Sequence, residues 1–295
     1  MTLALCSVRM LTLITMKKVL FFLPGRLLSS LPRSLQIWLG NLIGDIAFIL
    51  MRRRRKITVY NIQTAFPEAD SLKLSRNCFR HFGCSILEVF CLPFFGSSMK
   101  KWLRFRGMEV FQQLRDEGKG VILLTSHFGN WEVMSWCSQF DLQVSGLYQK
   151  LNLKIADELF MELRQVAGMK LIQKKSGIRE LIYGVLDQKQ IMGLVGDQGR
   201  GQTIDFFGKE TGFPLGPAET ALRKGVPMIL TVCVRRGHYL DMEVLEEIPL
   251  QSGEDEEEII YNTTKTYIKR LEKLVTDYPE QYFWLHDIWK KFKRQ

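Results

Sequence analysis

His127 and Glu132, a histidine and a carboxylate five residues apart, follow the apolar run of residues 120–124. The run predicts a buried strand, and Asn130 can cap a helix that begins near Trp131. On one continuous helix the two side chains would point about 140° apart, whereas across a strand–turn–helix junction they can meet. A histidine that deprotonates a hydroxyl needs a carboxylate on its other ring nitrogen. With no nucleophile in the same motif, the pair suits direct attack by a substrate hydroxyl on an activated acyl group.

The segment 127–132, HFGNWE, resembles the H-x4-D/E motif of the glycerolipid acyltransferase superfamily, in the form found in the lipid A late acyltransferases (lauroyl and myristoyl transferases). Further blocks similar to that family follow its order, at residues 61–68, 196–198, 206–208 with 216–218, and 279–290. The resemblance covers about residues 20 to 293. Tyr282 stands where the family usually has its first tryptophan of the last block, and Ile288 where arginine is common. These departures leave the fold prediction intact but weaken the choice of a particular acceptor.

The resemblance implies an α/β fold, glycerolipid acyltransferase-like, in which helices flank a mainly parallel sheet. It also implies a membrane-associated O-acyltransferase of lipopolysaccharide biosynthesis. Such an enzyme moves a fatty acyl chain from an acyl carrier protein thioester to a hydroxyl of a lipid A precursor. In this reading His127 is the general base, Glu132 orients it, and backbone N–H groups at the start of the following helix stabilise the oxyanion. The reaction needs no cofactor and no metal.

Four more residues are candidates for substrate binding: Asn130, Arg164, Asp197 and Gln198. Asp197 and Gln198 follow the predicted strand 191–195, so they lie at the same sheet edge as His127. Asp197 could bind acceptor hydroxyls, steady the His127 region, or cap a turn. The family often has an arginine that serves the active site at the place of Arg164, and a planar guanidinium suits phosphate. The alternative for Arg164 is a solvated position on a helix.

The sequence of 295 residues carries a net charge of +10, so an anionic partner is expected: nucleic acid, an anionic membrane or an acidic carrier protein. Residues 35–51 are apolar but short of the roughly 20 needed to span a bilayer, and five basic residues follow at 52–56. This pattern predicts an interfacial anchor, or a short span with its basic flank in the cytoplasm. The resemblance implies that the membrane is the cell inner membrane, with the enzyme at its cytoplasmic face. A buried helix with a solvated basic end is the alternative.

The division expected is a helical membrane anchor over residues 1–56 and an acyltransferase domain over 57–295; either Met1 or Met16 could be the start. The six cysteines show no C-x-x-C or zinc-type spacing, which favours buried reduced thiols. His286 is expected to pack structurally beside Trp284 and Trp289. The expected strands are 103–106, 121–125, 144–148, 191–195, 228–234 and 239–245, with helices between them and a last helix at 256–277. This alternation predicts a parallel sheet that ends in an antiparallel hairpin.

Several functions stay open from the residues alone. The acceptor could be another glycolipid, such as a mannosylated phosphatidylinositol, and the donor could be acyl-CoA. A hydrolase could use the same residues to activate water. A membrane-associated nucleic-acid-binding protein could use the basic runs 52–56 and 290–294, but no recognition motif accompanies them, so no nucleic acid is expected as a partner.

Overall fold

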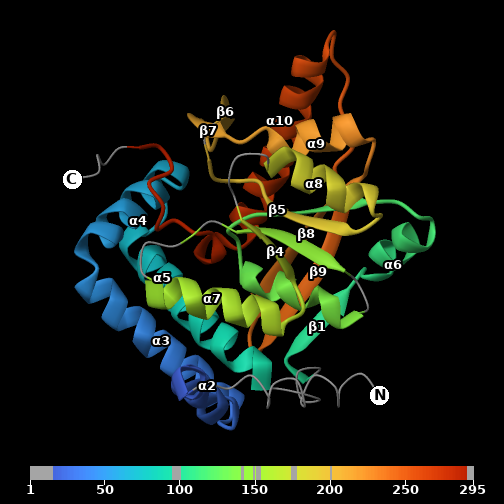
Figure 1. Cartoon of the computed structure of the whole chain (residues 1–295). Helices are drawn as coiled ribbons and strands as arrows, with labels where there is room; N and C mark the ends of the chain where they lie inside the picture. The colour runs from blue at the N-terminus through green and yellow to red at the C-terminus, as the bar shows by residue number, and fades with distance from the viewer. Residues whose placement is uncertain are drawn as a thin grey trace.

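The structure is a computed structural model that describes residues 16–94, 101–140, 143–148, 150, 154–173, 178–199 and 201–290. Its centre is a seven-stranded sheet with the strand order β1-β9-β8-β2-β5-β3-β4 (Figure 1). The strands are β1 (Leu103–Arg106), β2 (Val121–Thr125), β3 (Val144–Tyr148), β4 (Lys170–Gln173), β5 (Ile191–Val195), β8 (Met228–Arg236) and β9 (Tyr239–Glu247). All neighbours are parallel except β8 and β9, which form the antiparallel hairpin. The predicted α/β fold with a mainly parallel sheet is confirmed.

Three strands were absent from the prediction: β4, β6 (Gln202–Phe206) and β7 (Lys209–Phe213). The short strand β4 follows Gly168, whose φ of 90° ends the preceding helix, and it pairs with β3 at the edge of the sheet. A separate hairpin, formed by β6 and β7, turns at Phe207 and Gly208, which both have positive φ. Four-residue strands and turns at bulky residues give weak periodic signals, so such elements are hard to predict from a single sequence.

Side chains of the central strands alternate between two cores, one on each face of the sheet. Ile122 and Leu124 of β2 belong to one core, and Val121 and Leu123 belong to the other. The covering helices include α6 (Glu109–Asp116), α7 (Lys154–Val166), α8 (Ile178–Asp187), α9 (Gly216–Lys224) and α10 (Glu256–Asp277). Asp255 caps α10 by accepting a hydrogen bond from the Glu258 N–H at 2.9 Å. The strand ends are therefore held on a packed scaffold.

Before the first strand lie the helices α2 (Met16–Ser29), α3 (Arg33–Leu50), α4 (Arg52–Ala65) and α5 (Ser71–Cys91). Figure 1 shows α2, α3 and α4 on the outer side of α5. Glycines allow α3 and α5 to approach closely, because a Cβ atom on Gly83 would lie 2.2 Å from the Gly40 carbonyl oxygen and 2.7 Å from the Gly44 nitrogen. The helix α3 is thus packed firmly on α5 along its inner face.

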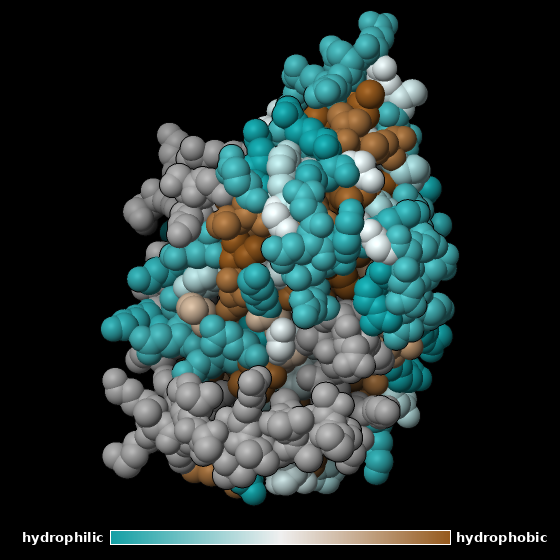
Figure 2. All heavy atoms as spheres, turned by 45° about the vertical axis from the view of Figure 1, so that its right-hand side comes forward, coloured by the Kyte–Doolittle hydropathy of each residue, from teal (hydrophilic) through white to brown (hydrophobic). Residues whose placement is uncertain are grey.

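Within the described part of the chain, none of the helices taken singly has the length and apolar character needed to cross a bilayer. The consecutive helices α3 and α4 meet those criteria only when taken together, and they are bent by 99°. The membrane anchor expected at residues 1–56 therefore remains a prediction. On the face of the molecule that Figure 2 shows, apolar residues are visible mainly in recesses between hydrophilic ones.

Candidate active site

His127 lies where the sequence predicts it, just beyond the carboxyl end of β2. The neighbouring parallel strand β5 ends at Val195, and the Gly196 N–H donates to the Thr125 carbonyl at 2.9 Å. This pairing brings Asp197 beside His127, although the two are 70 residues apart. Nδ1 of His127 lies 2.8 Å from Oδ1 of Asp197, and the His127 backbone N–H donates to the same oxygen at 3.1 Å. The carboxylate therefore holds both the ring and the backbone of the histidine.

The environment of this pair favours a charged imidazole. Burial lowers the pKa of His127, but the negative charge of Asp197 and its hydrogen bond outweigh burial, and Glu132 adds to them, so the net pKa is raised. The Asp197 side chain is fully buried, while 26% of the His127 side chain is exposed. With Nδ1 bound to Asp197, Nε2 is the ring nitrogen left to exchange a proton with a substrate.

The structure departs from the expected His127–Glu132 dyad. Glu132 faces Arg164, which donates from Nε and Nη2 to the two carboxylate oxygens at 2.8 and 2.6 Å. The carboxylate in contact with the His127 ring is Asp197. The reason is geometric: residues 126–130 form a loop after β2, and the chain enters a 3-10 helix, η3 (Trp131–Phe140), directly after it. Glu132 consequently points to α7, which carries Arg164, and remains near enough to influence the pKa of His127.

The last block of the chain completes the site. The Phe283 N–H donates to the His127 carbonyl at 2.9 Å, and Phe128 forms an antiparallel bridge with Tyr282. The rings of Trp131 and Phe283 flank the His127 ring at centroid distances of 5.1 and 6.1 Å. A segment more than 150 residues downstream thus binds residues 126–130, which we call the catalytic loop after the role predicted for His127, like an added strand. The spacing of the aromatic residues in the segment 279–290 indicates that it is packed, but only the structure shows what it packs against.

His286 stands three residues after Phe283 and donates its backbone N–H to the Phe283 carbonyl at 3.3 Å. Burial lowers the pKa of its imidazole, and a charge on His127 lowers it further, while Asp197 opposes the shift. This coupling puts His286 within electrostatic reach of the His127–Asp197 pair. Its backbone carbonyl accepts a hydrogen bond from the Asn61 amide at 2.7 Å, so the block 61–68 supports the same segment.

Gly129 is required by the geometry of the catalytic loop. Its φ is 60°, in the left-handed region, and an added Cβ atom would lie 1.8 Å from the Cys233 carbonyl oxygen of β8. That carbonyl accepts the Asn130 N–H at 2.9 Å, and the Gln281 carbonyl accepts the Gly129 N–H at 2.8 Å. The loop is therefore clamped between β8 and the C-terminal segment.

The four predicted substrate-binding residues separate into two groups. Arg164 and Asp197 contact the predicted catalytic residues directly. Asn130 is 2% exposed and donates from its side-chain amide to Glu88 at 2.9 Å, so it faces the protein interior. The Nε2 atom of Gln198 is buried without a partner among the described residues, as is Oδ2 of Asp197. Within the same part of the chain, His, Cys, Asp and Glu form no group of three or more that could hold a metal.

Comparison with known proteins identifies the family. Residues 6–291 match the family model described as bacterial lipid A biosynthesis acyltransferase. The lipid A biosynthesis palmitoleoyltransferase of Escherichia coli K12 is 24% identical over 279 residues, which cover 89% of this chain and 86% of that protein. The lipid A biosynthesis acyltransferase of Haemophilus influenzae is 26% identical over 284 residues, or 90% and 83% of the two chains.

A phosphatidylinositol mannoside acyltransferase of Mycolicibacterium smegmatis is 25% identical over 181 residues. This match covers 59% of the chain and only 58% of the mycobacterial protein. The names of both kinds of relative describe acyltransferases, and the family model spans nearly the whole sequence. The chain therefore belongs to the bacterial lipid A biosynthesis acyltransferases, a family of acyl-transferring enzymes.

Proposed function

We propose that the protein transfers a fatty acyl chain from an acyl carrier protein thioester to a hydroxyl of a lipid A precursor. The observation that carries this proposal is the contact between His127 and Asp197 at the carboxyl edge of the sheet. A histidine with one nitrogen fixed by a carboxylate and the other accessible is equipped for general base catalysis.

In the proposed reaction, Nε2 of His127 removes the proton from the acceptor hydroxyl as its oxygen attacks the thioester carbonyl carbon. The carbon–sulfur bond of the resulting tetrahedral intermediate breaks, and the imidazolium returns its proton to the leaving thiolate. Asp197 stabilises the imidazolium between these steps. The first turn of η3 follows the loop directly, and its backbone N–H groups are suited to hold the oxyanion.

Arg164 and Glu132 form the second part of the proposed machinery. The fork of Arg164 is held by both oxygens of Glu132, and only 24% of its side chain is exposed. A guanidinium fixed in this way presents its remaining N–H groups in one orientation, which suits an oxygen of the acceptor phosphate or of the thioester carbonyl. Glu132 is thus assigned the orientation of Arg164, and Asp197 the orientation of His127.

The acceptor is proposed to be a lipid A precursor because the lipid A enzymes match over most of both chains. The lipid A relatives of Escherichia coli and Haemophilus influenzae are covered for 86% and 83% of their lengths. The mycobacterial mannoside acyltransferase is covered for 58% of its length and supports the alternative acceptor, a phosphatidylinositol mannoside. The basic charge of the chain suits an acidic carrier protein as donor, with acyl-CoA as the competing donor.

The outer face of α3 is proposed to lie in the interface of the anionic inner membrane, on the cytoplasmic side. Its exposed side chains are large and apolar, among them Trp38, Ile46, Ile49 and Leu50, which are 48–72% exposed. Such a face is costly in water but stable at the boundary of a bilayer. Because α3 alone lacks the length and apolar character needed to span a bilayer, we favour an interfacial position for it over a transmembrane one.

The basic run at the start of α4 supports the same orientation. Four arginines, residues 52–55, open this helix, and positive charge at a helix N-terminus opposes the helix dipole. An anionic partner such as a phospholipid headgroup would relieve this repulsion. Residues 1–56 are thus proposed to form the membrane-binding part, and residues 57–295 the acyltransferase domain, with α3 packed on α5.

Mass spectrometry of lipid products tests the proposed function. Purified protein is incubated with acyl carrier protein or CoA thioesters of defined chain length and with a lipid A precursor or a phosphatidylinositol mannoside. We expect acylated lipid A precursor, formed fastest from the carrier protein donor and lost in His127→Ala. Thioester cleavage that does not require an acceptor would instead identify a hydrolase, and His127-independent transfer would refute the mechanism.

A further inference from the structure

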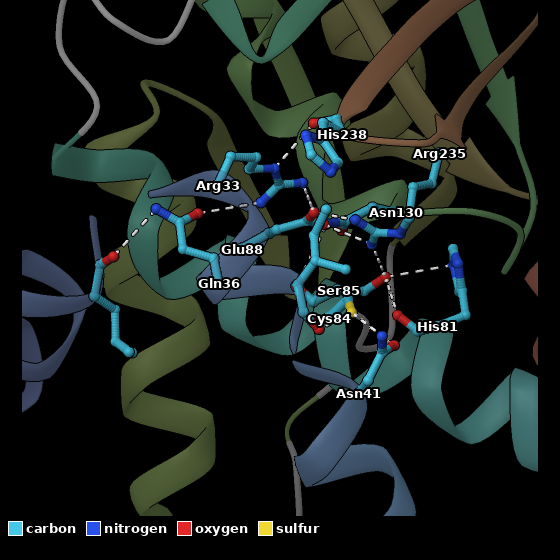
Figure 3. A network of polar contacts seen from close by, with 12 residues as sticks. Arg33, Gln36, Asn41, His81, Cys84, Ser85, Glu88, Asn130, Arg235 and His238 are labelled. Atoms are coloured by element: carbon cyan, nitrogen blue, oxygen red, sulfur yellow. Dashed lines mark hydrogen bonds and ion pairs between the residues drawn. The ribbon is translucent and has the colours of Figure 1, made fainter. Parts of the chain in front are cut away.

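Glu88 of α5 is a buried carboxylate that the proposed chemistry does not use. Its side chain is 1% exposed, and it is bound by two arginines from distant elements, Arg33 at the start of α3 and Arg235 near the end of β8 (Figure 3). Nη2 of Arg235 contacts the second carboxylate oxygen at 2.7 Å. A buried charge persists only where such partners and hydrogen bonds compensate it.

The third partner of Glu88 comes from the catalytic loop. Nδ2 of Asn130 donates to the second carboxylate oxygen of Glu88 at 2.9 Å and lies 3.3 Å from the Ser85 carbonyl oxygen. Asn130 stands between His127 and Glu132 in the sequence. In Figure 3, Arg33, Asn130 and Arg235 converge on the Glu88 carboxylate. One buried group therefore connects the N-terminal helix α3 with the loop that carries the proposed base.

The protonation states of the buried groups on α5 are fixed near neutral pH. Burial alone would raise the pKa of Glu88, but Arg235 and Arg33 lower it to about 2. His81, on the same helix, is kept neutral, because burial and the charge of Arg235 lower its pKa to about 3. Neither group changes its charge near neutral pH. The arrangement is consequently a fixed support and not a pH switch.

Both ends of the network are anchored. Nε of Arg33 donates to the His238 carbonyl at 2.9 Å, in the turn between β8 and β9, and its Nη1 donates to Gln36 at 3.2 Å. The Arg235 N–H donates to Gln281 at 2.9 Å, and Gln281 accepts the Gly129 N–H through its own carbonyl. A displacement of α3 relative to β8 would thus be felt at Glu88 and at the loop.

We propose that Glu88 is a positioning residue, which couples the placement of α3 to the catalytic loop through the contacts Arg33–Glu88–Asn130. This inference rests on the proposed function of His127 in acyl transfer. Small displacements of a base relative to its substrate cost large factors in rate, so a support of this kind acts on turnover. Substrate affinity is expected to change little, because Arg33, Glu88 and Asn130 are all buried and contact one another in the protein interior, including Asn130, which the sequence predicted to bind substrate.

The variant Arg33→Met tests the coupling without leaving an unpaired charge. It removes the cation from α3, while Glu88 keeps Arg235 as its counterion. Asp45→Asn is the matched control, because Asp45 also joins α3 to α5, through Arg76 and Arg80 at 2.7 and 2.8 Å, but at the other end of the helix. A role limited to α3–α5 packing would make the two variants alike.

Hydrogen–deuterium exchange of the full chain is the first measurement, since it does not depend on activity. We expect amides of residues 126–134 to exchange at least about threefold faster in Arg33→Met than in the parent, and at the parent rate in Asp45→Asn. Equal exchange of this loop in all three proteins would overturn the inference and leave the proposed function untouched.

A double-mutant cycle on kcat is the second measurement. We expect Asn130→Ala to lower kcat at least about tenfold with KM little changed, and Arg33→Met to lower it less. The double variant should be no more than about twofold slower than Asn130→Ala, because both changes break one connection. Effects that multiply would overturn the coupling. A parent that transfers no acyl group, or an active His127→Ala, would refute the proposed function, while the exchange result still decides the coupling.

Discussion

Both carboxylate oxygens of Glu132 contact the guanidinium of Arg164, at 2.8 and 2.6 Å, and so join η3 to α7. The pair gives a carboxylate five residues after the histidine a contact other than the histidine itself. In the proposed reaction it fixes an arginine beside the site, where charge develops during acyl transfer. Burial lowers the pKa of Arg164, but Glu132 outweighs this and raises it, so the group stays cationic.

Arg164→Lys should therefore remain defective, although it keeps the positive charge. Lysine cannot make the two-pronged contact with Glu132, so we expect kcat/KM to fall about tenfold to a hundredfold, and slightly further in Arg164→Ala. Lys154→Ala is the control, because that side chain lies on the same helix and is 85% exposed. Steady-state kinetics on one lipid acceptor compares the three. Parent-like rates for Arg164→Ala would reduce Arg164 to a surface residue.

Gly129→Ala should destabilise the protein strongly. The left-handed backbone costs a residue with a Cβ atom about 1–2 kcal/mol, and the 1.8 Å approach to the Cys233 carbonyl adds overpacking of about 1–3 kcal/mol. Gly184→Ala is the counterpart, since a Cβ there meets no atom within 4 Å inside α8. It should raise the free energy of unfolding by about 0.5–1 kcal/mol. Denaturant unfolding measures both. A Gly129→Ala protein as stable as the parent would contradict the clamped loop.

Exposed apolar residues on α3 should govern membrane binding. We expect the triple variant Trp38→Ser, Ile46→Ser, Ile49→Ser to bind vesicles of phosphatidylethanolamine and phosphatidylglycerol at least about tenfold more weakly, with an unchanged Tm. The control is Leu72→Ser, Leu181→Ser, Leu250→Ser, which changes exposed leucines outside α3. Flotation with vesicles gives the partition coefficients. Equal binding by both triple variants would remove α3 from the membrane contact.

Such substitutions are a better test than removal of residues 1–56. That deletion would also take away Arg33, which binds Glu88, and the glycines that pack α3 on α5. A truncated protein would leave α5 with an uncovered face and would lose one of the two cations beside a buried carboxylate. Loss of activity after truncation would then say nothing about the membrane.

The sequence was sufficient to predict six of the seven strands of the sheet, because its central strands are continuous apolar runs bounded by polar residues. The runs 121–125 and 191–195 appear in the structure with the predicted bounds. Because these two strands are neighbours, Asp197 lies beside His127 at the carboxyl edge of the sheet. Which carboxylate contacts the histidine could not be predicted. Glu132 is near in sequence and Asp197 near in space, and only the turn geometry after Gly129 separates the two.

The contacts that hold the catalytic loop in place could not be predicted from the sequence for a similar reason. Glu88 stands out as a carboxylate in an apolar helix pattern, which is compatible either with a position facing the site or with a basic partner, and the pattern does not say which residue that partner is. Arg33 and Arg235 lie 55 and 147 residues away from it. The bridge between Phe128 and Tyr282 likewise joins segments whose local patterns say nothing about one another.

The central claim is that His127 is the base and that Asp197 orients it. The pH dependence of kcat/KM for acyl transfer, in the parent, Asp197→Asn and Glu132→Gln, tests it most directly. Activity of the parent should rise with pH through a pKa above the usual value for histidine, because Asp197 stabilises the charged imidazole that must lose its proton.

In Asp197→Asn the imidazolium loses its main stabilising charge while burial remains, so the acid limb should move to lower pH. Its plateau should fall about 10²–10⁴-fold, because the ring is no longer held in the productive tautomer. Glu132→Gln should lower the plateau but shift the limb much less, since Glu132 has the smaller influence on this pKa. A limb that moves in Glu132→Gln and stays in place in Asp197→Asn would contradict the account.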